Sequence, residues 1–402
     1  MQTPLISVVM AVYNGGPYLA ASIESILNQT WRDFELIVVD DGSTDASWAI
    51  LTDYAARDER IVALRNPANA GVVRSLNTGL QKARGRIIAR QDADDISAPA
   101  RFQAQLDYLG SHNDYGLVAA VPQLIDPEGH PLDQTGRDAT ENEEIQSKLL
   151  DHMCLCGATI MVRRESLEAA GFFFSDGLNA SEDYDICLRL AEVTKVASLR
   201  GGLYLYRQLP QSASRTQEQR QALNKAIALE RAIYRRYGAA PAVQKLAPVG
   251  RDYLRAALIG AARCDLDAAR HSLRRAVEVY PPLFSDKALV EGLVKSYTPL
   301  GQVENALQYT DAVFRELLPA TLEYRRLRDR LASNLHMGEA FAAAGRGQYA
   351  LARVHLWQGL RRAPGWLLNR GVVVIGVKAL FARNSHTPGA GRHNRVDSGA
   401  GA

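Results

Sequence analysis

The sequence predicts an α/β domain built on a mostly parallel sheet, followed by an all-α domain. Short apolar runs rich in β-branched residues alternate with segments of helical spacing, as in right-handed βαβ units. These runs stop near residue 215, beyond which Ala, Leu, Arg and Glu dominate. The charge also changes: residues 1–217 hold 19 basic and 29 acidic side chains, a net charge of −10, whereas residues 218–402 hold 28 and 15, a net charge of +13. The two halves are therefore expected to face different partners.

Composition narrows the class of protein. The 402 residues suggest two domains, and 47% apolar and 23% charged residues are ordinary for a soluble globular chain. These values exclude a wholly disordered chain, a collagen and a disulfide scaffold. The four cysteines show no zinc or thioredoxin spacing, so we expect reduced, mostly buried thiols. The N-terminus shows no signal-peptide pattern, and the longest apolar run, 371–377, is too short to cross a bilayer. We therefore expect a cytoplasmic protein.

The first half yields its elements in order. The run 5–13 (LISVVMAVY) is typical of a strand buried on both faces, and 14–17 (NGGP) ends it. Further strands are expected at 34–39, 61–65, 86–90, 117–125, 158–162, 196–199 and 203–207. Helices are expected at 18–29, 46–56, 72–83, 101–109, 164–170 and 185–191. Ligands bind beyond the carboxyl ends of the strands in such sheets, and acidic clusters follow the strands at 34–39 and 86–90.

The second half is expected to be helical. Helices are predicted at 217–236, 252–263, 266–279, 286–297, 303–317, 322–344, 347–362 and 366–383. A repeat at an offset of 83 residues relates Ala269-Arg270, Leu273 and Pro281 to Ala352-Arg353, Leu356 and Pro364. It resembles tetratricopeptide-like helix pairs but lacks their Trp and Tyr pattern. We expect domains at 1–215 and 216–384, and a disordered, Gly-rich tail at 385–402.

Three acidic clusters carry the candidate chemistry. Asp92 and Asp94 follow a strand on a tight turn and can offer oxygens to one Mg²⁺ or Mn²⁺, although solvated acidic turns are also common. Asp41 ends another strand, where its carboxylate can bind the imide N–H of a pyrimidine or form an Asx turn. Glu182 and Asp183 lie near the start of the helix predicted at 185–191, where an ionised Asp183 can act as a general base or only cap the helix.

Four stretches together resemble family 2 glycosyltransferases of the GT-A fold. They are SVVMAVYNGGPYLAASIESILNQT (7–30), DFELIVVDDGSTDAS (33–47), NAGVVRSLNTGLQKARGRIIARQDADDISAPARFQAQ (69–105) and SEDYDICLRLA (181–191). Their order, spacing and strand context all agree with the family. The resemblance covers roughly residues 3–215 and implies an inverting transfer of a sugar from a nucleotide-diphosphate sugar to a hydroxyl acceptor.

The resemblance also implies roles for individual residues. Asp41 would contact the base, with Ala11 and Tyr13 lining the nucleotide pocket. The D-x-D motif would be Asp92, Ala93 and Asp94, with Asp94 the principal ligand of Mg²⁺ or Mn²⁺ and Asp92 beside it. The catalytic base would be Asp183. Supporting roles would fall to Asp95, Glu182 and Arg90, and Arg90 and Arg101 flank the acidic cluster, where they could pair with it or with phosphate.

The sequence departs from the family at two positions. Many relatives carry a His where Gly157 stands, before the Met-x-Arg-Arg strand, and many carry Y-R-x-H where this chain has Leu209 in place of the His. Both departures remove a candidate metal or phosphate contact.

The basic second half of the chain allows more than one interpretation of its function. Residues 366–383 mix apolar and basic side chains, which is typical either of an interfacial helix on an anionic membrane or of a packed terminal helix. Acceptors of such enzymes are often lipid-linked glycans, so peripheral attachment at the inner face of the cell membrane would suit a polysaccharide or glycoconjugate pathway. The competing functions are a scaffold with an inactive GT-A domain, and nucleotidyl transfer, for which 14–17 lacks a basic residue. No nucleic-acid module is recognisable.

Overall fold

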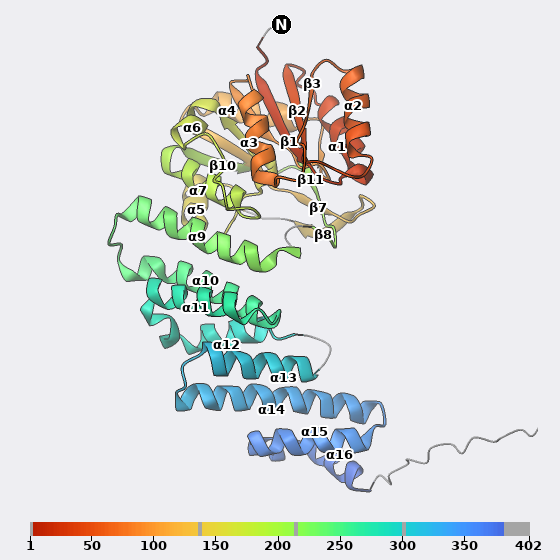
Figure 1. The fold of residues 1–402 in the computed structure, drawn as a ribbon, viewed down its shortest axis with the longest axis vertical. Coiled ribbons are helices and arrows are strands. Elements are labelled where there is room, and N and C mark those ends of the chain that lie inside the picture. Colours follow the sequence, from red (N-terminus) through yellow and green to blue (C-terminus); the bar gives the residue numbers. More distant parts are fainter. Residues whose placement is uncertain (1–2, 136–138, 213–215, 300–302, 382–402) are drawn as a thin grey trace, which may run out of the picture. The chain divides into compact units, whose positions relative to one another are not determined.

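The computed structural model describes residues 3–135, 139–212, 216–299 and 303–381. The chain forms two compact units, one up to Lys287 and one from Ala288. The first half contains a seven-stranded, mostly parallel sheet (Figure 1). Its order is β10 (Lys195–Leu199), β6 (Tyr115–Ala120), β9 (Met161–Arg163), β4 (Ile87–Arg90), β1 (Ile6–Val12), β2 (Phe34–Asp40) and β3 (Ile61–Arg65). Only β9 among these runs antiparallel to its neighbours, β4 and β6.

Both faces of this sheet are buried, as its near-continuous apolar strands require. Side chains alternate across β1, so Met10 packs with one set of helices while Val9 faces the other set. The first set is α1 (Gly16–Leu27), α2 (Ser47–Arg57) and α4 (Arg101–Ser111). The second set is α3 (Val72–Lys82), α6 (Arg164–Ala169) and α7 (Glu182–Val193). A mostly parallel sheet between helices, followed by a helical region, confirms the predicted fold class.

A second, four-stranded sheet was not expected as a separate unit. Its order is β5 (Ile96–Ser97), β11 (Tyr204–Arg207), β7 (Gln123–Ile125) and β8 (Pro131–Thr135). The predicted strand 117–125 is therefore wrong as one element, because β6 and β7 belong to different sheets. The predicted strand 158–162 is also wrong in part. Its first residues form the 3-10 turn η1 (Gly157–Thr159).

The helical region is as extensive as predicted. Its elements are α9 (Glu218–Tyr237), η2 (Val243–Leu246), α10 (Ala247–Ala262), α11 (Leu266–Val279), η3 (Pro281–Ser285), α12 (Lys287–Ser296), α13 (Val303–Ala312), η4 (Val313–Leu317), α14 (Leu322–Gly345), α15 (Tyr349–Arg362), η5 (Pro364–Leu368) and α16 (Arg370–Phe381). A short helix, α5 (Asn142–Leu149), packs at β10 in the first half. Among the described residues, no helix is both long and apolar enough to cross a membrane.

The 83-residue repeat is visible in the element bounds. Elements α11, η3 and the start of α12 recur, 83 residues later, as α15, η5 and the start of α16. The expected helix at 366–383 is interrupted at Asn369, between η5 and α16. The predicted domain division near residue 215 coincides with the change to all-helical structure, and we keep it as a proposal. The predicted tail at 385–402 lies outside the described residues.

Candidate functional site

The site is a cleft of about 560 Å³ at the carboxyl ends of β1 and β4. The parallel strands bring together residues that are far apart in the sequence. Eight of the predicted site residues line this cleft: Ala11, Tyr13, Asp41, Arg90, Asp92, Ala93, Asp94 and Glu182. Two others, Asp95 and Asp183, are not among the residues that line it. Tyr13 is half exposed at the cleft, as a side chain that receives a ligand must be.

Asp41 directly follows β2, and its carboxylate accepts three hydrogen bonds. Its Oδ1 accepts hydrogen bonds from Asn66 Nδ2 (2.7 Å) and the Ala70 N–H (2.9 Å), and its Oδ2 accepts one from the Gly71 N–H (2.8 Å). These bonds fix the loop that follows β3, whose Gly71 has a φ of +92° that favours glycine. Because a carboxylate offers about four acceptor positions, Asp41 keeps capacity for a ligand donor while it shapes that wall.

The D-x-D turn offers two carboxylates to the cleft. Burial, and then the charge of Asp92, raise the pKa of Asp94 to about 6. A divalent cation beside Asp94 would offset both the cost of burying its charge and the repulsion from Asp92. Mg²⁺ is commonly held by one or two carboxylates while substrate phosphates complete its shell. Among the described residues there is no cluster of three His, Cys, Asp or Glu side chains that could hold a metal without a substrate. Two carboxylates on one turn are a donor set that fits such a cation.

Asp95 belongs to the support of the turn. It is 1% exposed, and its carboxylate accepts hydrogen bonds from Tyr204 Oη (2.9 Å) and the Arg207 N–H (2.8 Å). Burial, and then its acidic neighbours, raise its pKa well above the ordinary value. These bonds tie the D-x-D turn to β11, so the second sheet positions the turn.

Arg101 is fully buried and cannot reach a phosphate. Its guanidinium donates to Gln91 Oε1 (3.0 Å), the Arg90 carbonyl oxygen (2.8 Å), Ser97 Oγ and Gln105 Oε1. Burial lowers its pKa to about 10. The Gln91 amide in turn donates to the carbonyl oxygens of Asp92 and Asp95. Arg101 is thus a positioning residue beneath the turn.

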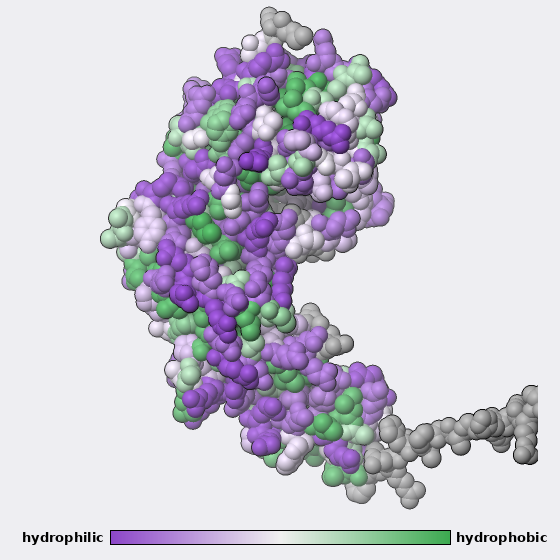
Figure 2. All heavy atoms as spheres, viewed as in Figure 1, coloured by the Kyte–Doolittle hydropathy of each residue, from purple (hydrophilic) through white to green (hydrophobic). Residues whose placement is uncertain are grey.

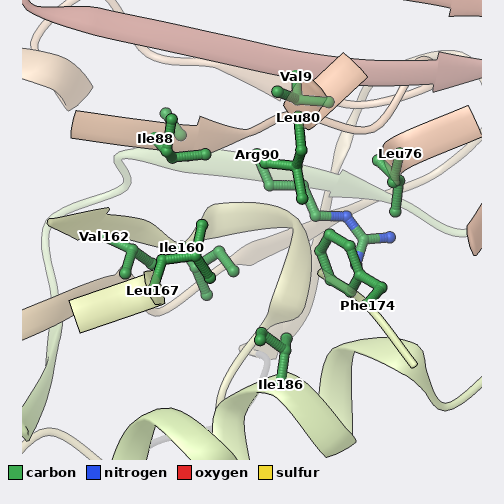
Figure 3. A pocket seen from close by; sticks show the side chains of 11 residues that line it. Val9, Leu76, Leu80, Ile88, Arg90, Ile160, Val162, Leu167, Phe174 and Ile186 are labelled. Atoms are coloured by element: carbon green, nitrogen blue, oxygen red, sulfur yellow. The ribbon is translucent and has the colours of Figure 1, made fainter. Parts of the chain in front are cut away.

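Arg90 links two acidic motifs, at Asp92 and Glu182, that are 90 residues apart. Its Nε lies 3.2 Å from Asp92 Oδ1, and its Nη2 lies 3.3 Å from Glu182 Oε1. Figure 3 shows the stem of Arg90 among apolar side chains and its guanidinium beside the Phe174 ring. Burial opposes the charge, yet Asp92, Glu182 and Asp183 outweigh it and raise the pKa of Arg90. Its Nη1 and Glu182 Oε2 are buried and have no hydrogen-bond partner among the residues that the structure describes, and both side chains line the cleft.

Glu182 and Asp183 begin α7, which starts three residues before the helix predicted at 185–191. Burial raises the pKa of Glu182, while the charge of Arg90 works against that rise. Asp183 is half-buried, and its Oδ1 accepts the N–H of Tyr184 (2.8 Å). The Asp183 side chain lies in the first turn of α7, where the helix macrodipole favours a negative charge.

The two departures from the family pattern have physical consequences. A Cβ built on Gly157 would lie 2.3 Å from the Cβ of Asp183, so no side chain fits there unless η1 or α7 moves. Leu209 is buried and lines the cleft with an apolar surface where a His would offer a ligand nitrogen.

Sequence reasoning missed several polar residues that line the cleft, and three of them lie near the starts of α7 and α9. Asn179 precedes α7, and Gln217 and Arg220 lie at the start of α9. Asn179 Oδ1 is buried without a hydrogen-bond partner. These residues do not belong to any motif at the end of a strand. Their position in the cleft depends on the packing of α9 against α7, which no local sequence pattern indicates.

Comparisons with known proteins identify one family. A family model described as Glycosyl transferase family 2 matches residues 7–171. An uncharacterized glycosyltransferase of Methanocaldococcus jannaschii is 35% identical over 191 residues, which cover 47% of this chain and 65% of that protein. The uncharacterized glycosyltransferase EpsJ of Bacillus subtilis is 32% identical over 253 residues, covering 60% of this chain and 73% of its own length. The O-antigen biosynthesis glycosyltransferase WbnJ of Escherichia coli is 34% identical over 188 residues, covering 46% and 71%.

Proposed function

This chain belongs to glycosyltransferase family 2, and we propose that it transfers a sugar from a nucleotide-diphosphate sugar to a hydroxyl acceptor with inversion at the anomeric carbon. The observation that carries the proposal is the single cleft at the strand ends, which gathers Asp41, the D-x-D turn and Glu182. A nucleotide sugar needs a base contact, a charge-neutralising diphosphate site and a polar sugar site. The cleft supplies all three kinds of surface.

The donor would lie across the strand ends. Ala11, Tyr13 and Asp41 would form the nucleoside side of the cleft, and Asp92 and Asp94 would hold the Mg²⁺ or Mn²⁺ that accompanies the diphosphate. Such a cation neutralises the leaving diphosphate when it is bound. Arg90 would orient Asp92 and Glu182 toward the sugar, because it bonds to both carboxylates.

Asp183 would act as the general base. An ionised carboxylate at the start of α7 can remove the acceptor proton as the acceptor oxygen attacks the anomeric carbon. Attack from the side opposite the diphosphate inverts the anomer in one displacement. No covalent sugar–enzyme intermediate is needed.

The pathway is proposed from the relatives. WbnJ is named for O-antigen biosynthesis, so a surface polysaccharide or another glycoconjugate is the product class we propose for this chain. The acceptor would be a glycan, a lipid-linked glycan or a protein, met in the cytoplasm at the inner face of the cell membrane. The competing function is a scaffold with an inactive catalytic domain. The presence of Asp41, Asp92 and Asp94 in the lining of one cleft supports the enzyme over the scaffold.

Donor screening tests the proposal. Purified protein is incubated with a panel of nucleotide sugars, with and without Mn²⁺, and release of nucleoside diphosphate is measured. We expect release with one donor class and its loss in Asp183→Asn. Asp176→Asn is the matched control, since Asp176 is exposed in a loop outside the cleft. Donor binding without turnover in any condition would favour the scaffold.

A further inference from the structure

The two copies of the internal repeat differ in their surfaces. We call 266–296 the first repeat and 349–379 the second repeat, and the same elements begin at matching positions in both. The first repeat contains four acidic residues: Asp267, Glu278, Asp286 and Glu291. At the matching positions the second repeat has Ala350, Arg361, Asn369 and Val374. The first repeat therefore serves as a reference against which the surface residues of the second repeat can be compared position by position.

The second repeat has gained apolar surface where the first is polar. His271, Arg274 and Glu291 correspond to Val354, Trp357 and Val374. These three apolar side chains are 50%, 68% and 52% exposed, so they do not serve the local core. Figure 2 shows apolar green surface among the purple in the part of the molecule drawn for α15 and α16.

A packing face of the first repeat is open in the second. Val290 and Val294 on α12 are fully buried, and Tyr309 of α13 donates a hydrogen bond to the Val294 carbonyl oxygen. Their counterparts on α16, Val373 and Val377, are each 50% exposed. Helix α16 buries its opposite side, on which Val372, Ile375 and Ala379 lie. The exposed stripe of α16, formed by Val373 and Val377, is therefore not the face that packs α16 against α15.

The segment that forms this surface carries charges of one sign only. Residues 349–381 contain five basic side chains, Arg353, Arg361, Arg362, Arg370 and Lys378, and no Asp or Glu. Like charge opposes pairing of this face with a second copy of itself, whereas an apolar surface flanked by Arg and Lys suits an anionic bilayer. The exposed Leu368, at 91%, lies in η5 between the two helices.

We propose that the α15–η5–α16 surface docks on an anionic lipid bilayer, with Trp357 and the exposed valines of α16 entering the interface and neighbouring basic side chains, Arg361 among them, contacting headgroups. This surface extends the proposed function by placing the enzyme where lipid-linked acceptors lie. It does not depend on catalysis, so vesicle binding can succeed or fail whether or not sugar transfer is found.

The test uses the full chain and vesicles of phosphatidylcholine, with or without phosphatidylserine, in a sedimentation assay. We expect partition to the phosphatidylserine vesicles, weakening with added salt. Arg361→Glu, which restores the acid of the first repeat, should lower the partition coefficient by roughly tenfold or more. Trp357→Arg introduces the residue that stands at the matching position of the first repeat. This substitution should lower the partition coefficient by roughly tenfold although it adds a positive charge, because it removes apolar surface.

The controls separate docking from net charge and from folding. Arg274→Glu makes the same charge change in the first repeat and should leave binding nearly unaltered. Unchanged thermal unfolding of each variant would show that the fold is intact, as expected for a side chain as exposed as Trp357. Equal binding to vesicles without phosphatidylserine, or equal losses in Arg274→Glu and Arg361→Glu, would overturn the proposal. So would a dimer in light scattering that Trp357→Arg dissociates while vesicle binding persists.

Discussion

The stability of the helical region should depend on one buried histidine. His336 on α14 is 2% exposed, its Nδ1 lies 3.0 Å from Nδ1 of His355, and its Nε2 has no hydrogen-bond partner. Burial, then the charge of Arg362 and the nearby His355, lower its pKa from 6.5 to about 4. One of the two Nδ1 atoms must carry the hydrogen, and protonation of His336 would also place a charge beside Arg362.

The sign and size of the effect follow from this pKa. Since the folded-state pKa is depressed, the unfolded chain takes up a proton first as the pH falls. The stabilisation is present above pH 6.5 and is lost progressively toward pH 4. With these two values, linkage gives a loss of about 2 kcal/mol in the free energy of unfolding between pH 7 and pH 5.

Urea unfolding followed by circular dichroism measures this loss. We compare the wild type with His336→Gln at pH 7 and pH 5, and use the exposed His271→Gln as the control. The wild type and the control should share the pH-dependent loss, and His336→Gln should lack about 2 kcal/mol of it. An identical pH dependence in His336→Gln and the wild type would refute the reasoning, whatever their stabilities at pH 7.

Three further substitutions probe the cleft and its support. Gly157→Ala should push Asp183 aside and lower transfer turnover by roughly 10²-fold without weakening donor binding. Gly110→Ala, which meets open space, is its control, and full turnover in Gly157→Ala would contradict the packing argument. Arg101→Met should lower the free energy of unfolding by roughly 2–4 kcal/mol in urea titration, because it strands several buried acceptors. Tyr204→Phe should cost roughly 1–3 kcal/mol in the same assay, by removing the donor to Asp95, and an unaltered midpoint would count against that bond.

The sequence predicted the first sheet well because local and global signals agree there. The strand expected at 34–39 is β2 (Phe34–Asp40), and the apolar run at 5–13 contains β1 (Ile6–Val12). Both are buried on two faces, so their apolar residues are continuous. The prediction of one strand at 117–125 was wrong because the chain passes from one sheet to another there while its residues remain apolar.

The candidate site was predictable wherever a motif follows a strand. The acidic residues at the ends of β2 and β4 lie in the cleft because parallel strands end at one edge. The roles of Arg101 and Tyr204 depend on contacts between segments about 100 residues apart, which no local pattern records. The same holds for Gly157, whose lack of a side chain matters only because α7 packs against it.

Calorimetric titration of nucleoside diphosphates in the presence of Mn²⁺ tests the central claim most directly. The D-x-D turn should make binding depend on the cation, because Asp92 and Asp94 repel an anion that arrives alone. We expect UDP or GDP to bind the wild type with Mn²⁺, and to bind roughly tenfold or more weakly without Mn²⁺ or in Asp94→Asn. Binding that is equally tight in all three conditions, or no binding of any nucleoside diphosphate to the folded protein, would contradict the account.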